Sequence, residues 1–227
     1  MRTLTVNRNQ IDYVGTFERP AFSLVGNTRI MEGLYDAFSV YQVTLADFRL
    51  DTGATVATDF GVNVFLKSLG QYRLRFDRVE WSVSGFVDED MPRLPEVLKK
   101  GEEWLRTMEP SLSFKSHTFV YNAHCQLSEG TSKEFLLGLH RNDDLNLGES
   151  LGNGLIHSWR DTNIGGRFNL VIDHSLFVKD GIFIQLISLI EDDQTDHSVV
   201  FAAGQTALNQ ALNNIGLQLE QEKEITS

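Results

Sequence analysis

The segment 157–161 carries the most varied side-chain chemistry in the sequence. Tryptophan and arginine are the residues that most often dominate the energy of protein interfaces, and histidine and aspartate add groups that exchange protons. A polar, glycine-rich stretch, residues 141–154, precedes this segment, and loops carry binding residues more often than cores do. We therefore predict a binding site formed by His157, Trp159, Arg160, Asp161 and Arg141. An edge strand whose tryptophan belongs to the core is the alternative.

The other proton-exchanging side chains show no catalytic or metal-binding spacing. None of the six histidines falls in an H-E-x-x-H pattern. Asp173, His174 and Ser175 contain all three residue types of a Ser-His-Asp triad, but consecutive residues cannot adopt that geometry. The acids at 88–90 precede a predicted helix, where they stabilise the positive end of the helix dipole. We predict no catalytic residue, no cofactor and no metal ion.

The charge of the chain limits the kinds of partner. With 31 acidic and 20 basic residues the net charge is −11, and phosphate binding needs clustered lysine and arginine. We therefore expect no direct contact with nucleic-acid phosphates. The acids form short clusters, which favours a role in solubility over one continuous acidic face.

Three further absences indicate the compartment. The single cysteine, Cys125, cannot form an intrachain disulfide, as is usual in a reducing cytosol. Residues 1–6 lack the apolar region of a secretory signal. Because no run of about 18 apolar residues occurs, we expect no transmembrane helix and no contact with a membrane. We predict a cytoplasmic protein.

In the first half of the chain, the spacing of apolar residues changes from that of strands to that of a helix. A strand is expected at 3–6 and a short helix at 31–38. Apolar residues then alternate with polar ones from Tyr41 to Leu50 and again between Val62 and Val83, which predicts an antiparallel meander. From Leu94 to Met108 the apolar spacing becomes 3.6 residues, which predicts a helix of about four turns that faces the core.

The second half repeats this order. Strands are expected at 119–127 and 155–159, with a capping box at Thr131–Glu134 that begins a short helix between them. A strand from Arg167 turns at Asp180-Gly181 into Ile182–Ile190, which is apolar on both phases. We expect this last strand to lie at the centre of the sheet, covered on both faces. A second long helix follows, with an apolar stripe from Phe201 to Leu219.

Together these patterns predict an α+β fold. A mainly antiparallel sheet would be covered by the two longer amphipathic helices, and the order of meander and helix occurs twice. We predict a single globular domain over residues 1–227, with similar halves at 1–110 and 111–227.

Residues 166–226 resemble a sporadically distributed bacterial family of uncharacterised proteins. The similarity is carried by Gly166-Arg167-Phe168-Asn169-Leu170-Val171-Ile172, the Asp180-Gly181 turn with its apolar strand, and a terminal helix that closes with Ile225-Thr226. The family has no assigned activity, so the resemblance implies no catalytic residue. Its scattered distribution implies an accessory or defence-type role.

We therefore expect a non-enzymatic binding or assembly module in a bacterial protein complex, with a protein partner or self-association. Two alternatives stay open. One is a hydrolase or nuclease-like enzyme that uses dispersed aspartate, glutamate and histidine. It requires two of His140, His157, Asp161, Asp173 and His174 to converge in a pocket. The other is an acidic inhibitor that mimics nucleic acid.

Overall fold

The computed structural model describes residues 1–24, 28–51, 60–139 and 154–221. It contains one sheet of ten strands, in the order β2-β3-β4-β5-β1-β6-β9-β8-β7, with β10 beside the first residues of β1. All neighbours are antiparallel except the parallel pair β1 and β10. The strands are β1 (Arg2–Phe17), β2 (Phe48–Asp51), β3 (Gly61–Phe65), β4 (Gln71–Arg75), β5 (Arg78–Ser84), β6 (Phe114–Leu127), β7 (Leu155–Asp161), β8 (Gly166–His174), β9 (Ile182–Ile190) and β10 (Leu217–Gln221).

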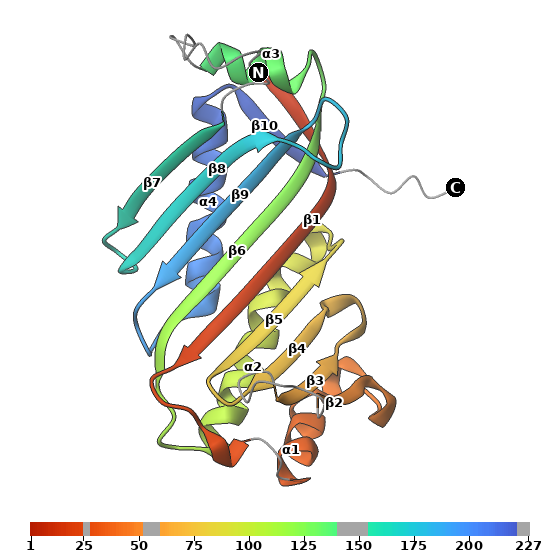
Figure 1. Cartoon of the computed structure of the whole chain (residues 1–227), viewed down its shortest axis with the longest axis vertical. Coiled ribbons are helices and arrows are strands. Elements are labelled where there is room, and N and C mark those ends of the chain that lie inside the picture. Colours follow the sequence, from red (N-terminus) through yellow and green to blue (C-terminus); the bar gives the residue numbers. More distant parts are fainter. Residues whose placement is uncertain (25–27, 52–59, 140–153, 222–227) are drawn as a thin grey trace.

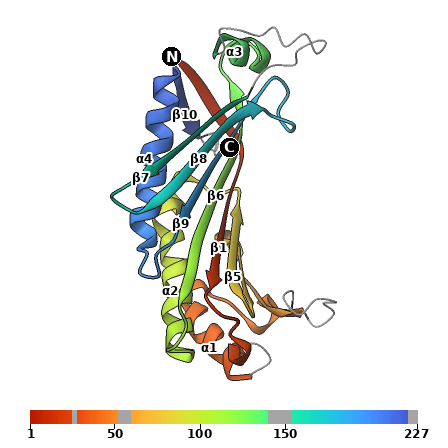
Figure 2. The ribbon, with the colours of Figure 1, turned by 60° about the vertical axis from the view of Figure 1, so that its left-hand side comes forward.

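Three helices cover one face of the sheet: α1 (Thr28–Phe38), α2 (Leu94–Met108) and α4 (His197–Asn214). Figure 2 shows them side by side along that face, while the short helix α3 (Ser132–Leu139) lies at one end of the strands. Helix α2 has the bounds that its apolar period predicts, and it buries Leu94, Val97, Leu98 and Leu105. This confirms the expected α+β fold with a mainly antiparallel sheet.

The same sequence of elements occurs twice. A long strand, a short helix, a meander and a long helix appear as β1, α1, β2 to β5 and α2, and again as β6, α3, β7 to β9 and α4. The long strands β1 and β6 lie side by side near the middle of the sheet, and each meander extends outward from its own long strand (Figure 1).

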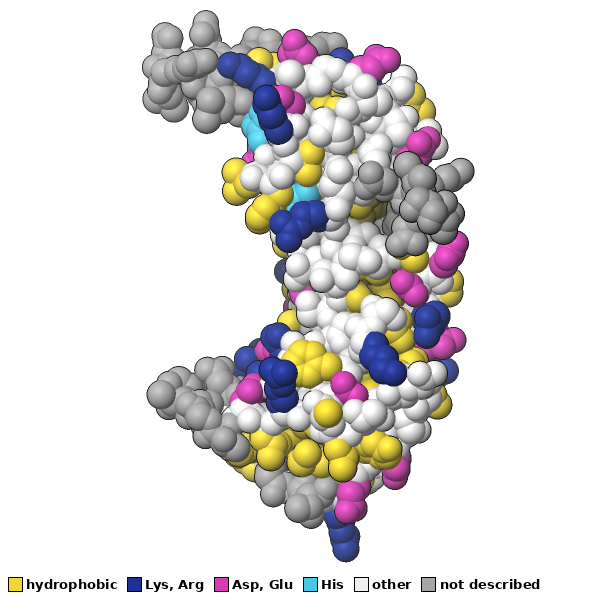
Figure 3. Space-filling view, turned by 90° about the vertical axis from the view of Figure 1, so that its right-hand side faces the viewer, with side chains coloured by type: hydrophobic (Ala, Val, Ile, Leu, Met, Phe, Trp, Pro, Cys, Tyr) yellow, Lys and Arg dark blue, Asp and Glu magenta, His cyan; other side chains and the backbone are white. Residues whose placement is uncertain are grey.

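Residues 182–190 were expected to be covered on both faces of the sheet, and this expectation was wrong. Along β9, buried and half-buried residues alternate, so only one face is covered. Strand β9 is also not the central strand, because β1 holds the middle of the order. The apolar side chains on the uncovered face, Phe183, Ile187 and Leu189, are half-buried by the neighbouring strands. This is why the strand is apolar on both phases although helices cover only one face. We call the uncovered face the open face. Figure 3 shows that the molecule is a crescent that is hollowed on this side.

The second long helix does not reach Leu219. Helix α4 ends at Asn214, Gly216 adopts a positive φ of 79°, and Leu217–Gln221 form β10 beside β1.

Two further predictions were wrong. The first strand does not end at Val6 but continues to Phe17, past a register shift between Val6 and Arg8 that interrupts the alternation of side chains. Residues 41–45 do not form a strand. Two 3-10 turns, Ser39–Tyr41 and Leu45–Asp47, replace it, because the Asp47 carboxylate accepts hydrogen bonds from the backbone N–H and hydroxyl of Thr44.

The predicted capping box at the start of α3 is confirmed. The Glu134 carboxylate accepts from the Thr131 backbone N–H at 3.0 Å, and the Thr131 hydroxyl accepts from the Glu134 N–H at 3.2 Å. Within the described ranges, no helix has both the length and the apolar character needed to cross a bilayer.

Candidate functional site

The open face is built from side chains that occupy matching registers on neighbouring strands. At one level Arg8, His124, Phe183 and Asp173 are direct partners across β1, β6, β9 and β8. Side chains at paired positions on one face of a sheet lie close enough to contact each other. The His124 and Phe183 rings are 4.8 Å apart, so these two side chains of the row are in contact.

The loop between β8 and β9 lies over this row. Phe177 packs edge-on against His124, with ring centroids 4.7 Å apart, and the Arg8 guanidinium lies 4.7 Å from the Phe177 ring. Leu176 and Phe177 remain 92% and 65% exposed, which is unusual for large apolar side chains. We call Arg8, His124, Leu176, Phe177 and Phe183 the aromatic cluster.

Hydrogen bonds hold this loop in place. The Ser175 hydroxyl accepts from the backbone N–H groups of Phe177 and Val178 and lies 2.9 Å from His124 Nδ1. The Ser175 N–H in turn donates to the Gly181 carbonyl. The exposed apolar side chains are therefore presented by an ordered turn.

A second row crosses all nine strands of the main order. Its members, from β7 to β2, are Arg160, Arg167, Leu189, Thr118, Val14, Glu80, Arg73, Asn63 and Arg49. Arginines occupy both ends. Over all paired positions of the open face there are seven arginines and five acids, although the whole chain carries −11. Arg8 and Arg160 make no ion pair with any described residue.

The residues that the sequence singles out lie on the edge strand β7 but on both of its faces. His157 stacks on Trp159 at 5.5 Å, and Trp159 stacks on the buried Phe168 at 5.3 Å, so these two face the helix side. Arg160 lies opposite Arg167 on the open face. The Asp161 carboxylate accepts from the Asn163 N–H. Arg141 falls outside the described residues. The structure therefore does not gather the described members into one pocket, and their binding role stays a prediction.

The residues named for an enzyme do not converge either. His140 lies outside the described residues. Among His157, Asp161, Asp173 and His174, no hydrogen bond joins two side chains. His174 Nδ1 instead contacts the Ser132 hydroxyl at 2.7 Å.

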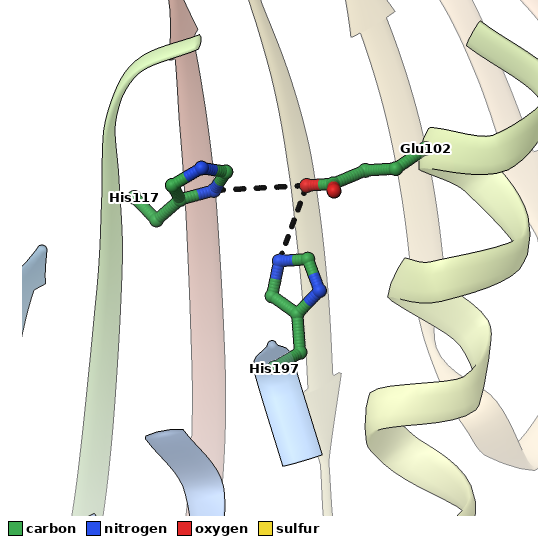
Figure 4. A group of neighbouring side chains, drawn as sticks. All are labelled: Glu102, His117 and His197. Carbon is green, nitrogen blue, oxygen red and sulfur yellow. Dashed lines mark ion pairs between the residues drawn. The ribbon is translucent and has the colours of Figure 1, made fainter. Parts of the chain in front are cut away.

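A buried polar cluster that the sequence did not predict lies between the two halves. Glu102 comes from α2, His117 from β6 and His197 from the first residue of α4, as Figure 4 shows. Glu102 Oε1 lies 3.1 Å from His197 Nε2 and 3.6 Å from His117 Nδ1. Tyr13 on β1 donates its hydroxyl proton to Glu102 Oε1 at 2.7 Å, and its oxygen lies 2.8 Å from His117 Nδ1.

Burial determines the protonation of this cluster. It lowers the pKa of the His117 imidazole to about 4, so the ring is neutral at pH 7. Burial also raises the pKa of the Glu102 carboxyl, but the contacts with His197 and Tyr13 more than offset this and keep that pKa below its ordinary value. Glu102 is therefore an ionised carboxylate in a buried site.

One signal in the sequence points to this cluster. Glu102 lies four residues after Leu98 and three before Leu105, which places a carboxylate inside the apolar stripe of α2. A carboxylate at a core position needs a buried partner. His117 and His197 carry no such signal, because topology alone brings them to Glu102.

Comparisons with known proteins provide little information. No protein-family model matches the chain, and no curated protein matches it in sequence. Among solved structures, the chain is similar to the rolling circle replication initiator protein from Geobacillus stearothermophilus, with 8% identity and a TM-score of 0.28 over 93% of this chain and 81% of that one. A similarity at this level carries no argument about function. The resemblance of residues 166–226 to a bacterial family stays a prediction.

Proposed function

We propose that the protein is a non-enzymatic binding module that holds an acidic, partly apolar segment of a partner protein against its open face. The observation that carries this proposal is the aromatic cluster, in which an ordered turn exposes Leu176 and Phe177 beside an arginine that has no described ion-pair partner. Aromatic and arginine side chains are enriched among the residues that dominate interface energy.

The size of the open face is adequate for such a partner. Nine strands at a spacing of about 4.8 Å give a width of roughly 40 Å. A stable interface buries about 800 Å² on each partner, which is a fraction of such a surface. A segment bound over the aromatic cluster would therefore have room to extend along the arginine row.

The charge of the open face favours an acidic protein over a nucleic acid. Several of its arginines are already paired within the sheet, as in Arg73–Glu80, Arg75–Asp51 and Arg78–Glu80. Acids interspersed with arginines repel a continuous phosphate backbone, whereas a protein segment can place individual carboxylates opposite Arg8 and Arg160. The buried, single Cys125 supports a reducing compartment, in keeping with a cytoplasmic complex.

Selection from a random peptide display library on the full chain tests this proposal. We expect enriched peptides that combine acidic and large apolar residues. The substitutions Phe177→Ala and Arg8→Ala should each weaken the best peptide by at least about tenfold, or 1.4 kcal/mol.

Leu45→Ala is the matched control, because Leu45 is a large apolar residue that is 79% exposed and lies outside the open face. The Leu45→Ala variant should bind the selected peptide with the affinity of the wild type. Peptides that bind all three variants equally, or a chain that binds a single-stranded oligonucleotide in preference to any peptide, would overturn the proposal.

A further inference from the structure

We infer that Glu102, His117 and His197 form a binding site for one divalent metal ion, with Zn²⁺ as the best-matched ion. One carboxylate oxygen and two imidazole nitrogens are a donor set that zinc commonly takes in proteins. All three ligand atoms lie within 4.8 Å of one another, and all three residues are buried. This inference is independent of the proposed function of the open face.

The two distances from the carboxylate oxygen to the imidazole nitrogens agree with a tetrahedral ion. Zinc bonds of 2.0–2.1 Å place neighbouring ligand atoms about 3.3 Å apart. Glu102 Oε1 lies 3.1 Å from His197 Nε2 and 3.6 Å from His117 Nδ1, on either side of that value. Small side-chain movements would therefore complete the coordination.

The burial of the site also favours a bound cation. The exposed fractions of Glu102, His117 and His197 are 9%, 0% and 4%. A carboxylate and imidazoles that are buried together need hydrogen-bond partners or a metal ion.

Tyr13 is the positioning residue of this site. Its hydroxyl donates to Glu102 Oε1, which is the usual way in which an outer hydrogen bond orients a metal-binding carboxylate. Its oxygen also lies 2.8 Å from His117 Nδ1. Binding of an ion would free that nitrogen from Tyr13 while leaving the hydrogen bond to Glu102 in place.

The site has a route from solvent. A surface cavity of about 300 Å³ is lined by Glu102 and His197, together with Lys99, Arg106 and the segment 194–198. The Arg106 guanidinium forms an ion pair with the Asp193 carboxylate at 3.1 Å and donates to the Asp193 carbonyl at 2.7 Å, so its charge is partly neutralised. A bound ion would join α2 of the first half to β6 and α4 of the second, and its fourth coordination position would be open for water.

Titration of the chelator-treated full chain with Zn²⁺ and with Co²⁺ tests this inference. We expect one ion per chain, visible Co²⁺ absorption typical of four-coordinate sites, and a rise in melting temperature on adding Zn²⁺. In His197→Asn, the affinity for Zn²⁺ should fall by more than roughly 100-fold. In Tyr13→Phe, the fall should be roughly 10–100-fold, as for other outer hydrogen-bond partners of metal ligands.

His174→Asn is the matched control, because His174 is a half-buried histidine bonded to Ser132 far from the cluster, and it should bind Zn²⁺ as the wild type does. The Co²⁺ spectrum and the stoichiometry are read on the wild-type chain, so they do not depend on the folding of any variant. Failure of the wild type to bind one equivalent of either ion, or unchanged Zn²⁺ affinity in a folded His197→Asn, would overturn the inference.

Discussion

At the residue scale, the hydroxyl of Tyr13 is the contact that joins the most elements. It links β1 to Glu102 on α2 and to His117 on β6, and all three side chains are buried. A hydrogen bond to a buried charged group contributes more to stability than one between neutral groups, because its loss leaves the charge without compensation. Single-atom changes in this cluster should therefore have effects that are large for their size.

Removal of that hydroxyl tests its contribution. We expect Tyr13→Phe to lower the free energy of unfolding by about 2 kcal/mol in chelator-containing buffer, because the buried Glu102 carboxylate loses the hydrogen bond from Tyr13. Tyr35→Phe removes a hydroxyl from a side chain that is 38% exposed and should change stability by less than about 0.5 kcal/mol. Urea unfolding of both variants is the measurement, and equal effects would contradict the role given to Tyr13.

The His117 imidazole makes stability depend on pH. Its pKa is about 4 in the folded chain and 6.5 when exposed, so the unfolded chain binds more protons between these values. Stability is therefore fully retained above pH 6.5 and falls as the pH drops toward 4, by roughly 3 kcal/mol. His117→Asn keeps a donor near Tyr13 but cannot titrate, so its urea midpoint should fall less over this range. A variant with the full wild-type pH dependence would show that another group is responsible.

At the scale of elements, the sequence predicts helices and strands that have a regular apolar period. It does not predict contacts between residues that are far apart in the chain. Helix α2 has the predicted bounds because one apolar stripe continues through all its turns. Strand β1 was missed beyond Val6 because a bulge and four polar residues, Asn7 to Gln10, conceal the alternation that resumes at Ile11. The buried cluster could not be predicted as a group, since its members come from four elements that only the folded sheet brings together.

Glycines in two helices provide a matched pair of predictions. A methyl group at Gly101 in α2 would lie 2.6 Å from the hydroxyl oxygen of Tyr72, which is itself buried. In contrast, nothing lies within 4 Å of the corresponding position at Gly138 in α3. Alanine is the better helix former by about 1 kcal/mol, so Gly138→Ala should stabilise the chain by up to that amount. Gly101→Ala should destabilise it by about 1–3 kcal/mol through overpacking. Thermal unfolding measures the change in melting temperature of each variant. Changes of the same sign in Gly101→Ala and Gly138→Ala would contradict this prediction.

At the scale of the whole molecule, the charge of the open face differs from that of the chain. The open face carries seven arginines and five acids at paired positions, whereas the chain as a whole is at −11, so most acids lie outside these positions. A partner with an acidic surface is therefore attracted to the open face more than to the chain as a whole, which favours one orientation.

This uneven distribution predicts a dependence on salt. Affinity for the selected acidic peptide should fall as ionic strength rises from 0.05 to about 0.5 M, because exposed charge pairs are screened over about 10 Å at 0.1 M. The loss should be smaller for Arg8→Ala than for the wild type, and fluorescence anisotropy at several salt concentrations measures both. An affinity that does not change with salt would indicate that apolar contacts alone hold the peptide.

The most direct test of the open face as the binding surface is photo-crosslinking in the cells that naturally produce the chain. A photoreactive amino acid replaces Phe177 in one version of the chain and Leu45 in another. We predict a discrete adduct from position 177 that is sensitive to protease, resistant to nuclease, competed by the selected acidic peptide and lost with Arg8→Glu, and no such adduct from position 45. A nuclease-sensitive adduct, or the same adducts from both positions, would contradict the account.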